Sequence, residues 1–129
     1  MKILIAVMGI LWLVLAAPAQ RQKRTADVAV LEAKARRAEG KILVDGRVQF
    51  TAVKKSRGLI VVFDLLSAED QVLATEKAVV EEEVIEPGEE RSIHAETAEI
   101  SRAVRFRIRT FDGGDRELRT ENPGPYPIE

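Results

Sequence analysis

The sequence predicts an all-β fold: an antiparallel β-sandwich of about seven strands, preceded by an N-terminal signal peptide helix. Apolar and polar residues alternate with a period of two in several short segments, which is typical of half-buried strands. Turn-forming residues separate these segments, as they do in all-β domains. The most apolar segment outside the N-terminus, residues 58–66, is β-branched at three successive positions, and we interpret it as the central strand.

Composition limits the classes of function. The 129 residues are enough for one domain. Charged residues make up 32% of the chain, but the net charge is −1, which argues against a strong electrostatic attraction to nucleic acid or to a membrane surface. The sequence contains no cysteine, so it has no disulfide framework. We therefore expect a domain that core packing alone holds together.

The N-terminal segment has the three parts of a secretory signal peptide over residues 1–19. Lys2 supplies a positive charge, residues 3–15 are apolar or small, and an A-x-A cleavage site ends at Ala19. The apolar run is shorter than the roughly 20 residues that span a bilayer. We expect cleavage between Ala19 and Gln20 and export to the periplasm or the medium, without stable membrane insertion afterwards. The alternative is an uncleaved signal that anchors the domain.

Residues 27–39 fit both a helix and a strand. Strong helix formers fill the centre of this segment. Leu31, Ala33 and Ala35 nevertheless alternate with charged residues, as in a half-buried strand. Residues 38–41 have the composition of a hairpin turn. We predict a strand because the remaining chain is β, and we keep the helix as the alternative.

The next two predicted strands differ in how their faces are composed. Residues 41–52 alternate, and their apolar face includes Gly46, where a missing side chain predicts a close backbone approach or a bulge. Residues 58–66 are apolar on both faces except at Asp64. Such a pattern indicates a central strand that is covered on both sides, or a face that meets another subunit.

The middle of the chain is expected to contain three further strands. Residues 71–75 are predicted to form a short strand that pairs back on the central one, followed by strands at residues 78–85 and 91–100. Glu86-Pro87-Gly88-Glu89 lies between the last two. Proline presets φ at the first central position and glycine accepts a positive φ at the second, which predicts a type II turn.

Residues 103–111 show the clearest alternation in the chain. One face carries Val104, Phe106, Ile108 and Thr110, and the other carries Arg105, Arg107 and Arg109. We therefore expect one buried face and one exposed ladder of arginines. A tight turn at residues 112–115 and a short edge strand at residues 116–120 complete the predicted sandwich.

These assignments divide the chain into four parts. They are the signal peptide at residues 1–19, a basic, disordered lead-in at residues 20–27, the sandwich at residues 28–120 and a Pro-rich tail at residues 121–129. Three prolines in the tail lack an N–H donor. The tail is therefore expected to be extended, to form no ladder, and to pack Tyr126 and Ile128 against the domain.

Three short motifs occur in order along the predicted strands: Gly46-Arg47-Val48, Phe63-Asp64-Leu65-Leu66-Ser67 and Pro87-Gly88-Glu89. Together they resemble the G-x-V, F-x-L-y-D and P-G elements of the FxLyD domain family, small immunoglobulin-like modules of exported prokaryotic proteins. Leu66 and Ser67 depart from the aromatic residue and the aspartate of that signature. The resemblance covers roughly residues 31–110. It implies an immunoglobulin-like sandwich and no catalytic residues.

No residue pattern predicts catalysis, a metal site or a cofactor. His94 is the only histidine, and no cysteine could join it in a zinc site. Strand alternation places Glu81 and Glu83 on one face and Glu82 on the other, which argues against a converging pair of carboxylates. No nucleophile elbow or phosphate-binding glycine loop occurs. We therefore predict that the protein is not an enzyme.

The ladder of Arg105, Arg107 and Arg109 is the sharpest surface feature and supports two interpretations. It is a possible anion-binding face, or it is a solvated sheet face on which the arginines pair with glutamates of a neighbouring strand. The near-equal numbers of both charges favour the second interpretation. The few aromatic residues of the predicted domain also argue against a site for sugar or single-stranded nucleic acid.

The sequence thus predicts an exported, non-enzymatic, immunoglobulin-like module that mediates protein–protein contacts in the bacterial cell envelope. Its partner would be an unknown envelope protein, and exposed strand edges make an edge-strand homo-oligomer a second form of contact. The alternative function is a binding module for an anionic glycan or lipid head group, which would require the three arginines to stand unpaired on one face. No nucleic-acid partner is expected.

Overall fold

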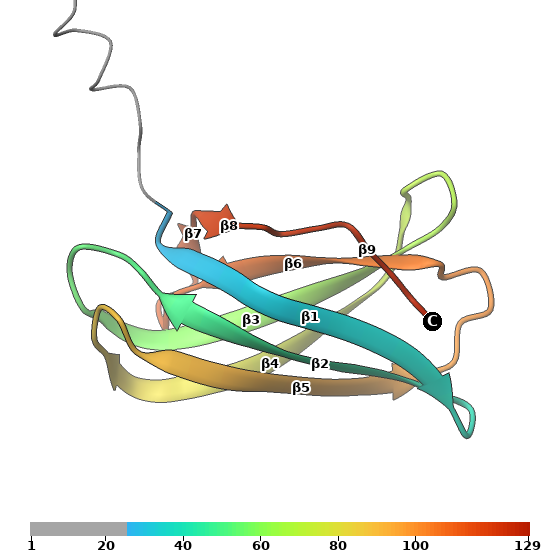
Figure 1. The fold of residues 1–129 in the computed structure, drawn as a ribbon, viewed down its shortest axis with the longest axis horizontal. Helices are drawn as coiled ribbons and strands as arrows, with labels where there is room; N and C mark the ends of the chain where they lie inside the picture. Colours follow the sequence, from blue (N-terminus) through green and yellow to red (C-terminus); the bar gives the residue numbers. More distant parts are fainter. Residues whose placement is uncertain (1–25) are drawn as a thin grey trace, which may run out of the picture.

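The computed structural model describes residues 26–129, and these form two β-sheets packed face to face (Figure 1). The all-β sandwich prediction is therefore confirmed. The predicted signal peptide, its cleavage site and residues 20–25 of the predicted lead-in lie outside the described residues. Within residues 26–129, no helix has the length and apolar character that a membrane span requires.

The first sheet has the strand order β5-β2-β1-β8, and the second has the order β4-β3-β6-β7 with β9 also on β6. With β1, β2 and β5 in one sheet and β3, β6 and β7 in the other, the arrangement is immunoglobulin-like, except that β4 joins the second sheet. The strands are β1 (Val28–Ala38), β2 (Lys41–Phe50), β3 (Ser56–Leu66), β4 (Val72–Ile85), β5 (Glu90–Ala98), β6 (Arg105–Phe111), β7 (Glu117–Leu118), β8 (Thr120–Glu121) and β9 (Tyr126–Pro127).

The core lies between the two sheets. Phe50 of β2, Phe63 of β3 and Phe106 of β6 are its largest fully buried side chains. The inward side chains of β6 are buried as the alternation predicted, although Val104 precedes the strand and is 37% exposed. Replacing one of these phenylalanines by alanine would cost about 3–5 kcal/mol.

β1 and β2 form a tight hairpin. Its loop residues Glu39 and Gly40 have φ angles of 52° and 76°, and Ala38 pairs with Lys41. Two successive positive φ angles define a type I′ turn, which matches the twist of the flanking strands. Residues 28–38 are therefore a strand, as predicted. Burial of the inward face of β1 overrides the local helix propensity.

A β-bulge in β1 lies next to Gly46. The register with β2 shifts between Val30 and Glu32, and a Cβ atom on Gly46 would lie 2.3 Å from the Glu32 carbonyl oxygen. The predicted close approach at Gly46 is therefore confirmed. The predicted position of Leu31 beside Ala33 and Ala35 was wrong, because the bulge moves the alternation by one residue and leaves Leu31 41% exposed.

β3 is the central strand of the second sheet, between β4 and β6, as predicted. Its partner β4 is one strand of 14 residues, which corrects the two strands expected at residues 71–75 and 78–85. Glu76 and Lys77 interrupt the apolar pattern, but an edge strand accommodates them. Ser67 closes the β3–β4 turn, since its Oγ accepts hydrogen bonds from the N–H groups of Glu69 and Gln71 at 3.2 and 3.1 Å.

The turn between β4 and β5 carries the chain from the second sheet to the first. Gly88 has a φ of 93°, and the Glu89 N–H donates to the Glu86 carbonyl at 3.2 Å. The predicted type II turn at this position is confirmed.

The C-terminal tail joins the two sheets along the edge of the sandwich opposite β4 and β5 (Figure 1). β8 pairs in parallel with β1, β9 pairs with β6, and Ile128 forms a bridge to Ala35. The prediction that the tail forms no ladder was wrong. Proline lacks a donor but keeps its acceptor, and the Pro123 carbonyl accepts from the Ile108 N–H at 2.9 Å. Tyr126 and Ile128 pack against the core, as predicted.

Candidate functional site

The predicted arginine ladder lies on the outer face of the second sheet, where outward side chains form rows across β4, β3 and β6. The pairings place Val79, Ile60 and Phe111 in one row and Lys77, Val62 and Arg109 in the next. A third row contains Thr75, Asp64 and Arg107, and a fourth contains Val72, Leu66 and Arg105. The first row is therefore entirely apolar, and the other three rows mix apolar, polar and charged side chains.

Asp64 is a buried carboxylate at the centre of this face, with a side-chain exposure of 0%. Arg107 and Arg109 both hold it: Arg107 Nη2 lies 2.9 Å and Arg109 Nε 2.8 Å from Asp64 Oδ2, and Arg109 Nη2 lies 3.0 Å from Oδ1. The Thr75 hydroxyl donates to Oδ1 at 2.9 Å. All oxygens of the buried charge are thus hydrogen-bonded, as a buried charge requires.

The balance of burial and hydrogen bonding sets the charge of Asp64. Burial alone would raise its pKa, but the hydrogen bonds from Arg109, Arg107 and Thr75 outweigh this effect and place the pKa below its ordinary value. Asp64 is therefore ionised at neutral pH. The arginine side chains that contact it remain 41% and 36% exposed, so their aliphatic stems cover Val62 and Asp64 while their outer edges meet solvent.

All three predicted site residues are engaged with aspartates. Arg105 completes the set, since its Nη2 lies 2.7 Å from Asp70 Oδ1 in the β3–β4 turn. The interpretation of a paired sheet face therefore describes the geometry, but the expectation of glutamate partners was wrong. The sequence did contain a clue to this pairing. An aspartate within an apolar central strand is expected to be buried and therefore to need a cationic partner, and the alternating arginines of the neighbouring strand are the obvious candidates.

A hollow of about 310 Å³ lies beside this cluster, lined by Ile60, Val62, Thr75, Lys77, Arg109, Phe111 and Asp115. Val79, which pairs with Ile60 and is 57% exposed, lies next to it on β4. The Arg109 guanidinium lies 5.6 Å from the centre of the Phe111 ring. Lys77 forms no ion pair with any other residue in the range 26–129. The hollow thus combines the apolar side chains of Ile60, Val62 and Phe111 with charged groups of both signs, Lys77 and Asp115 among them.

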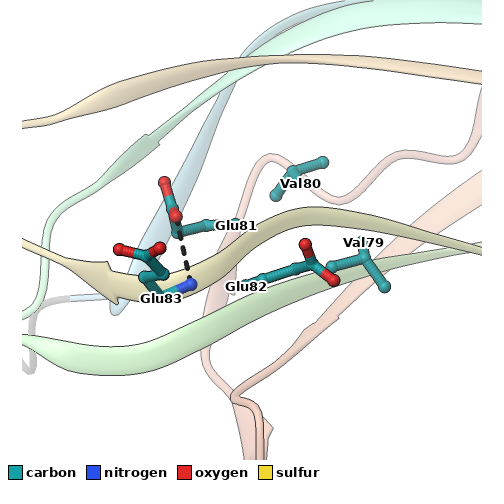
Figure 2. A pocket seen from close by; sticks show the side chains of 5 residues that line it. All are labelled: Val79, Val80, Glu81, Glu82 and Glu83. Carbon is teal, nitrogen blue, oxygen red and sulfur yellow. Dashed lines mark hydrogen bonds between the residues drawn. The ribbon is translucent and has the colours of Figure 1, made fainter.

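A second hollow, of about 500 Å³, lies along β4 and is lined by Val79, Val80, Glu81, Glu82 and Glu83. Figure 2 shows the carboxylates of Glu81 and Glu83 on one side and Glu82 directed away from them. Glu81 accepts two hydrogen bonds from Arg91 of β5, at 2.9 and 2.6 Å, which lower its pKa. The Glu81–Arg91 ion pair therefore links β4 of the second sheet to β5 of the first. Glu81, Glu82 and Glu83 do not form a pair of free carboxylates directed at one substrate or ion.

His94 lies on the outer face of the first sheet, between two carboxylates. Its Nδ1 is 2.7 Å from Asp45 Oδ1, and its Nε2 is 3.2 Å from Glu96 Oε2. The hydrogen bonds to Asp45 and Glu96 raise the pKa of His94. The site is 55% exposed at His94, and residues 26–129 contain no group of three or more His, Asp or Glu residues that could hold a metal ion.

The comparisons with known proteins concern the fold. No protein-family model matches the sequence, and no curated protein matches it. The structure is similar to part of a β-glucuronidase from glycoside hydrolase family 2, with a TM-score of 0.51 and 9% identity over 73% of this chain. Weaker similarities join it to Bacteroides uniformis β-glucuronidase 2 (TM-score 0.49, 14% identity, 72% of this chain) and to IrmA from Escherichia coli (TM-score 0.49, 11% identity, 79% of this chain and 97% of that chain).

The match to the β-glucuronidases covers only a small part of those enzymes. This chain spans 12% of the length of each, which corresponds to one sandwich within a much longer chain. At 9% identity the likeness to the family 2 β-glucuronidase concerns the sandwich fold and carries no catalytic role.

Proposed function

We propose that this chain is an exported, non-enzymatic, immunoglobulin-like module that acts through protein–protein contacts in the bacterial cell envelope. Export rests on the predicted signal peptide and its cleavage site at Ala19. The contact function rests on one observation above all: the outer face of the second sheet has an apolar row, Val79, Ile60 and Phe111, that no third layer within residues 26–129 covers. Exposed apolar rows with a charged border are typical of contact surfaces.

The alternative function, binding of an anionic glycan or lipid head group, has weaker support. It requires free guanidinium groups, whereas Arg105, Arg107 and Arg109 each donate to an aspartate. Replacement of Arg105 and Arg107 by alanine tests it directly. Unchanged binding to an anionic polymer would eliminate the arginine face as the site.

Crosslinking in the native host tests the proposed function. A photoreactive amino acid at Val79 is expected to link the chain to one envelope protein, because this side chain belongs to the apolar row and is 57% exposed. The same label at Val53, which is 85% exposed in the loop after β2, serves as the matched control and should give no such product. Mass spectrometry of the same sample reports the mature N-terminus, for which we expect Gln20.

The outcomes separate the parts of the proposal. Reproducible linkage at Val79 that a Lys77→Glu substitution reduces would support a contact on this face. Equal products from Val79 and Val53 would show non-specific labelling and remove the support for this surface. An intact Met1 would overturn signal cleavage and leave a membrane-anchored domain.

A further inference from the structure

β5 presents a regular strand edge with which no other strand of residues 26–129 pairs. Its pairing with β2 runs from Lys41↔Ala98 to Gln49↔Glu90 without a register shift. The Glu99 N–H donates to the Gly40 carbonyl, and the Phe50 N–H donates to the Glu89 carbonyl. Because an antiparallel ladder alternates, the odd-numbered residues of β5 hydrogen-bond to β2 and the even-numbered ones direct their N–H and C=O groups outward.

The neighbouring edge, β4, lacks this regularity. Its register with β3 shifts at three places. Glu76 lies on its inward side, opposite the core residue Phe63, and accepts from the Thr97 hydroxyl of β5 at 3.4 Å. Bulges and inward charges are the features that prevent an edge strand from pairing with another chain. β5 has one inward charge, Arg91, which pairs with Glu81 near the start of the strand, and residues 92–98 have none on their inward side. Of the two edges on this side of the sandwich, β5 is therefore the one suited to accept a strand.

We propose that a second copy of this chain docks on β5, with the two β5 strands antiparallel about a two-fold axis at Ala95. Ala95 then faces its own copy as a non-hydrogen-bonded pair. His94 lies opposite Glu96 of the other copy, and Ser92 lies opposite Ala98, both as hydrogen-bonded pairs. The two first sheets become one continuous sheet, and the contact is isologous, as two-fold dimers require.

Charge and chemistry select this register. In this register, His94 of each copy lies opposite the Glu96 carboxylate of the other copy. Between residues 92 and 98, no two like charges lie opposite each other. A register centred on Ile93 would place Glu90 opposite Glu96, and one centred on His94 would place two histidines together; like charges directly opposite destabilise a sheet. The inward residues Ile93, Ala95 and Thr97 continue the partly apolar inner side across the junction.

Single cysteines test the register, since the chain contains none of its own. In a non-hydrogen-bonded pair the Cα atoms lie about 4.5 Å apart, which a disulfide can bridge. Ala95→Cys, in the chain purified from its host, is expected to form a disulfide-linked dimer under copper phenanthroline. Ser92→Cys on the same strand is the matched control, because six residues of offset separate the two thiols by roughly 20 Å.

Charge exchange tests the same contact without oxidation. Sedimentation equilibrium of the unsubstituted chain should give twice the chain mass. Glu96→Lys should raise the dissociation constant at least tenfold, and adding His94→Glu to it should restore the dimer, because each glutamate again faces a lysine. Unchanged circular dichroism in both variants would show that the fold is intact.

Two results would overturn the inference: a monomer at all concentrations, or crosslinking at a His94→Cys position in place of Ala95→Cys. The β5 edge is separate from the Val79 surface on which the proposed function rests. The Ala95→Cys disulfide tests only the β5 edge, and the photocrosslink at Val79 tests only the surface of the proposed function. Failure of one experiment therefore leaves the other conclusion untouched.

Discussion

The two outer faces of the sandwich both carry ion pairs, but the faces differ in how deeply the paired groups are buried. On the first sheet, Arg47 pairs with Glu32 and Glu90, and all three side chains are about half exposed, at 46%, 54% and 48%. On the second sheet, Arg107 and Arg109 converge on Asp64, which is fully buried. Exposed ion pairs contribute little to stability, whereas a buried charge depends on its partners. The number of ion pairs on a face therefore does not measure how much they contribute to stability.

Removing both cations from the second face should have the largest effect. In Arg107→Met/Arg109→Met, Asp64 keeps only the Thr75 hydroxyl as a side-chain partner, and leaving a buried charge unpaired costs about 3–5 kcal/mol. Urea denaturation should report this loss in the free energy of unfolding. Arg36→Met on β1, whose residue is exposed, is the matched control and should change stability by less than about 0.5 kcal/mol.

Removing the buried anion as well tests the reason for that loss. Adding Asp64→Leu to the double variant replaces the ionic cluster by apolar side chains, a change that is often neutral or stabilising. We expect most of the lost stability to return in the same denaturation assay. A triple variant as unstable as the double one would show that packing of the arginine stems, and not the unpaired charge, caused the loss.

Acid should weaken the second face through Asp64. The folded pKa of this carboxyl lies below its ordinary value of 3.8, so its contribution is fully present above about that pH and disappears as the pH falls through the folded value. Unfolding free energies measured from pH 7 to pH 2 should therefore decline less steeply below pH 4 for Asp64→Asn than for the unsubstituted chain. Parallel curves would contradict a lowered pKa.

On the first face, Arg47→Ala should have a small effect, below about 1 kcal/mol, because both of its partners are exposed. Added salt should reduce the difference further by screening. A loss as large as that of the double arginine variant would refute the distinction between the faces.

The smallest effect concerns His94. Its pKa is raised by the hydrogen bonds to Asp45 and Glu96, so its contribution is present below the unfolded pKa and disappears as the pH rises through the folded one. Asp45→Asn should move the NMR titration midpoint of His94 to lower pH. An unchanged midpoint would show that Asp45 does not set it.

The sequence predicted the fold better than the site, for physical reasons. Alternation and turn chemistry are local, so the hairpin at Glu39-Gly40 and the turn at Gly88 were readable. The bulge at Leu31 was not, because it arises from the approach of two strands at Gly46. The Asp64 cluster joins residues 43 and 45 positions apart in the chain. Only the register of β3 with β6 identifies its partners.

The pairing of the C-terminal tail with both sheets also affects how the chain folds during its synthesis. The Arg119 N–H donates to the Asp27 carboxylate, 92 residues away, and Val28 pairs with Thr120. Such pairings raise the contact order, and domains dominated by non-local pairs fold slowly. While the chain is being synthesised, the edges of β1 and β6 that later pair with the tail stay unpaired until residues 120–128 are available. Until then, these unpaired strand edges are the places where wrong pairing with another chain is expected.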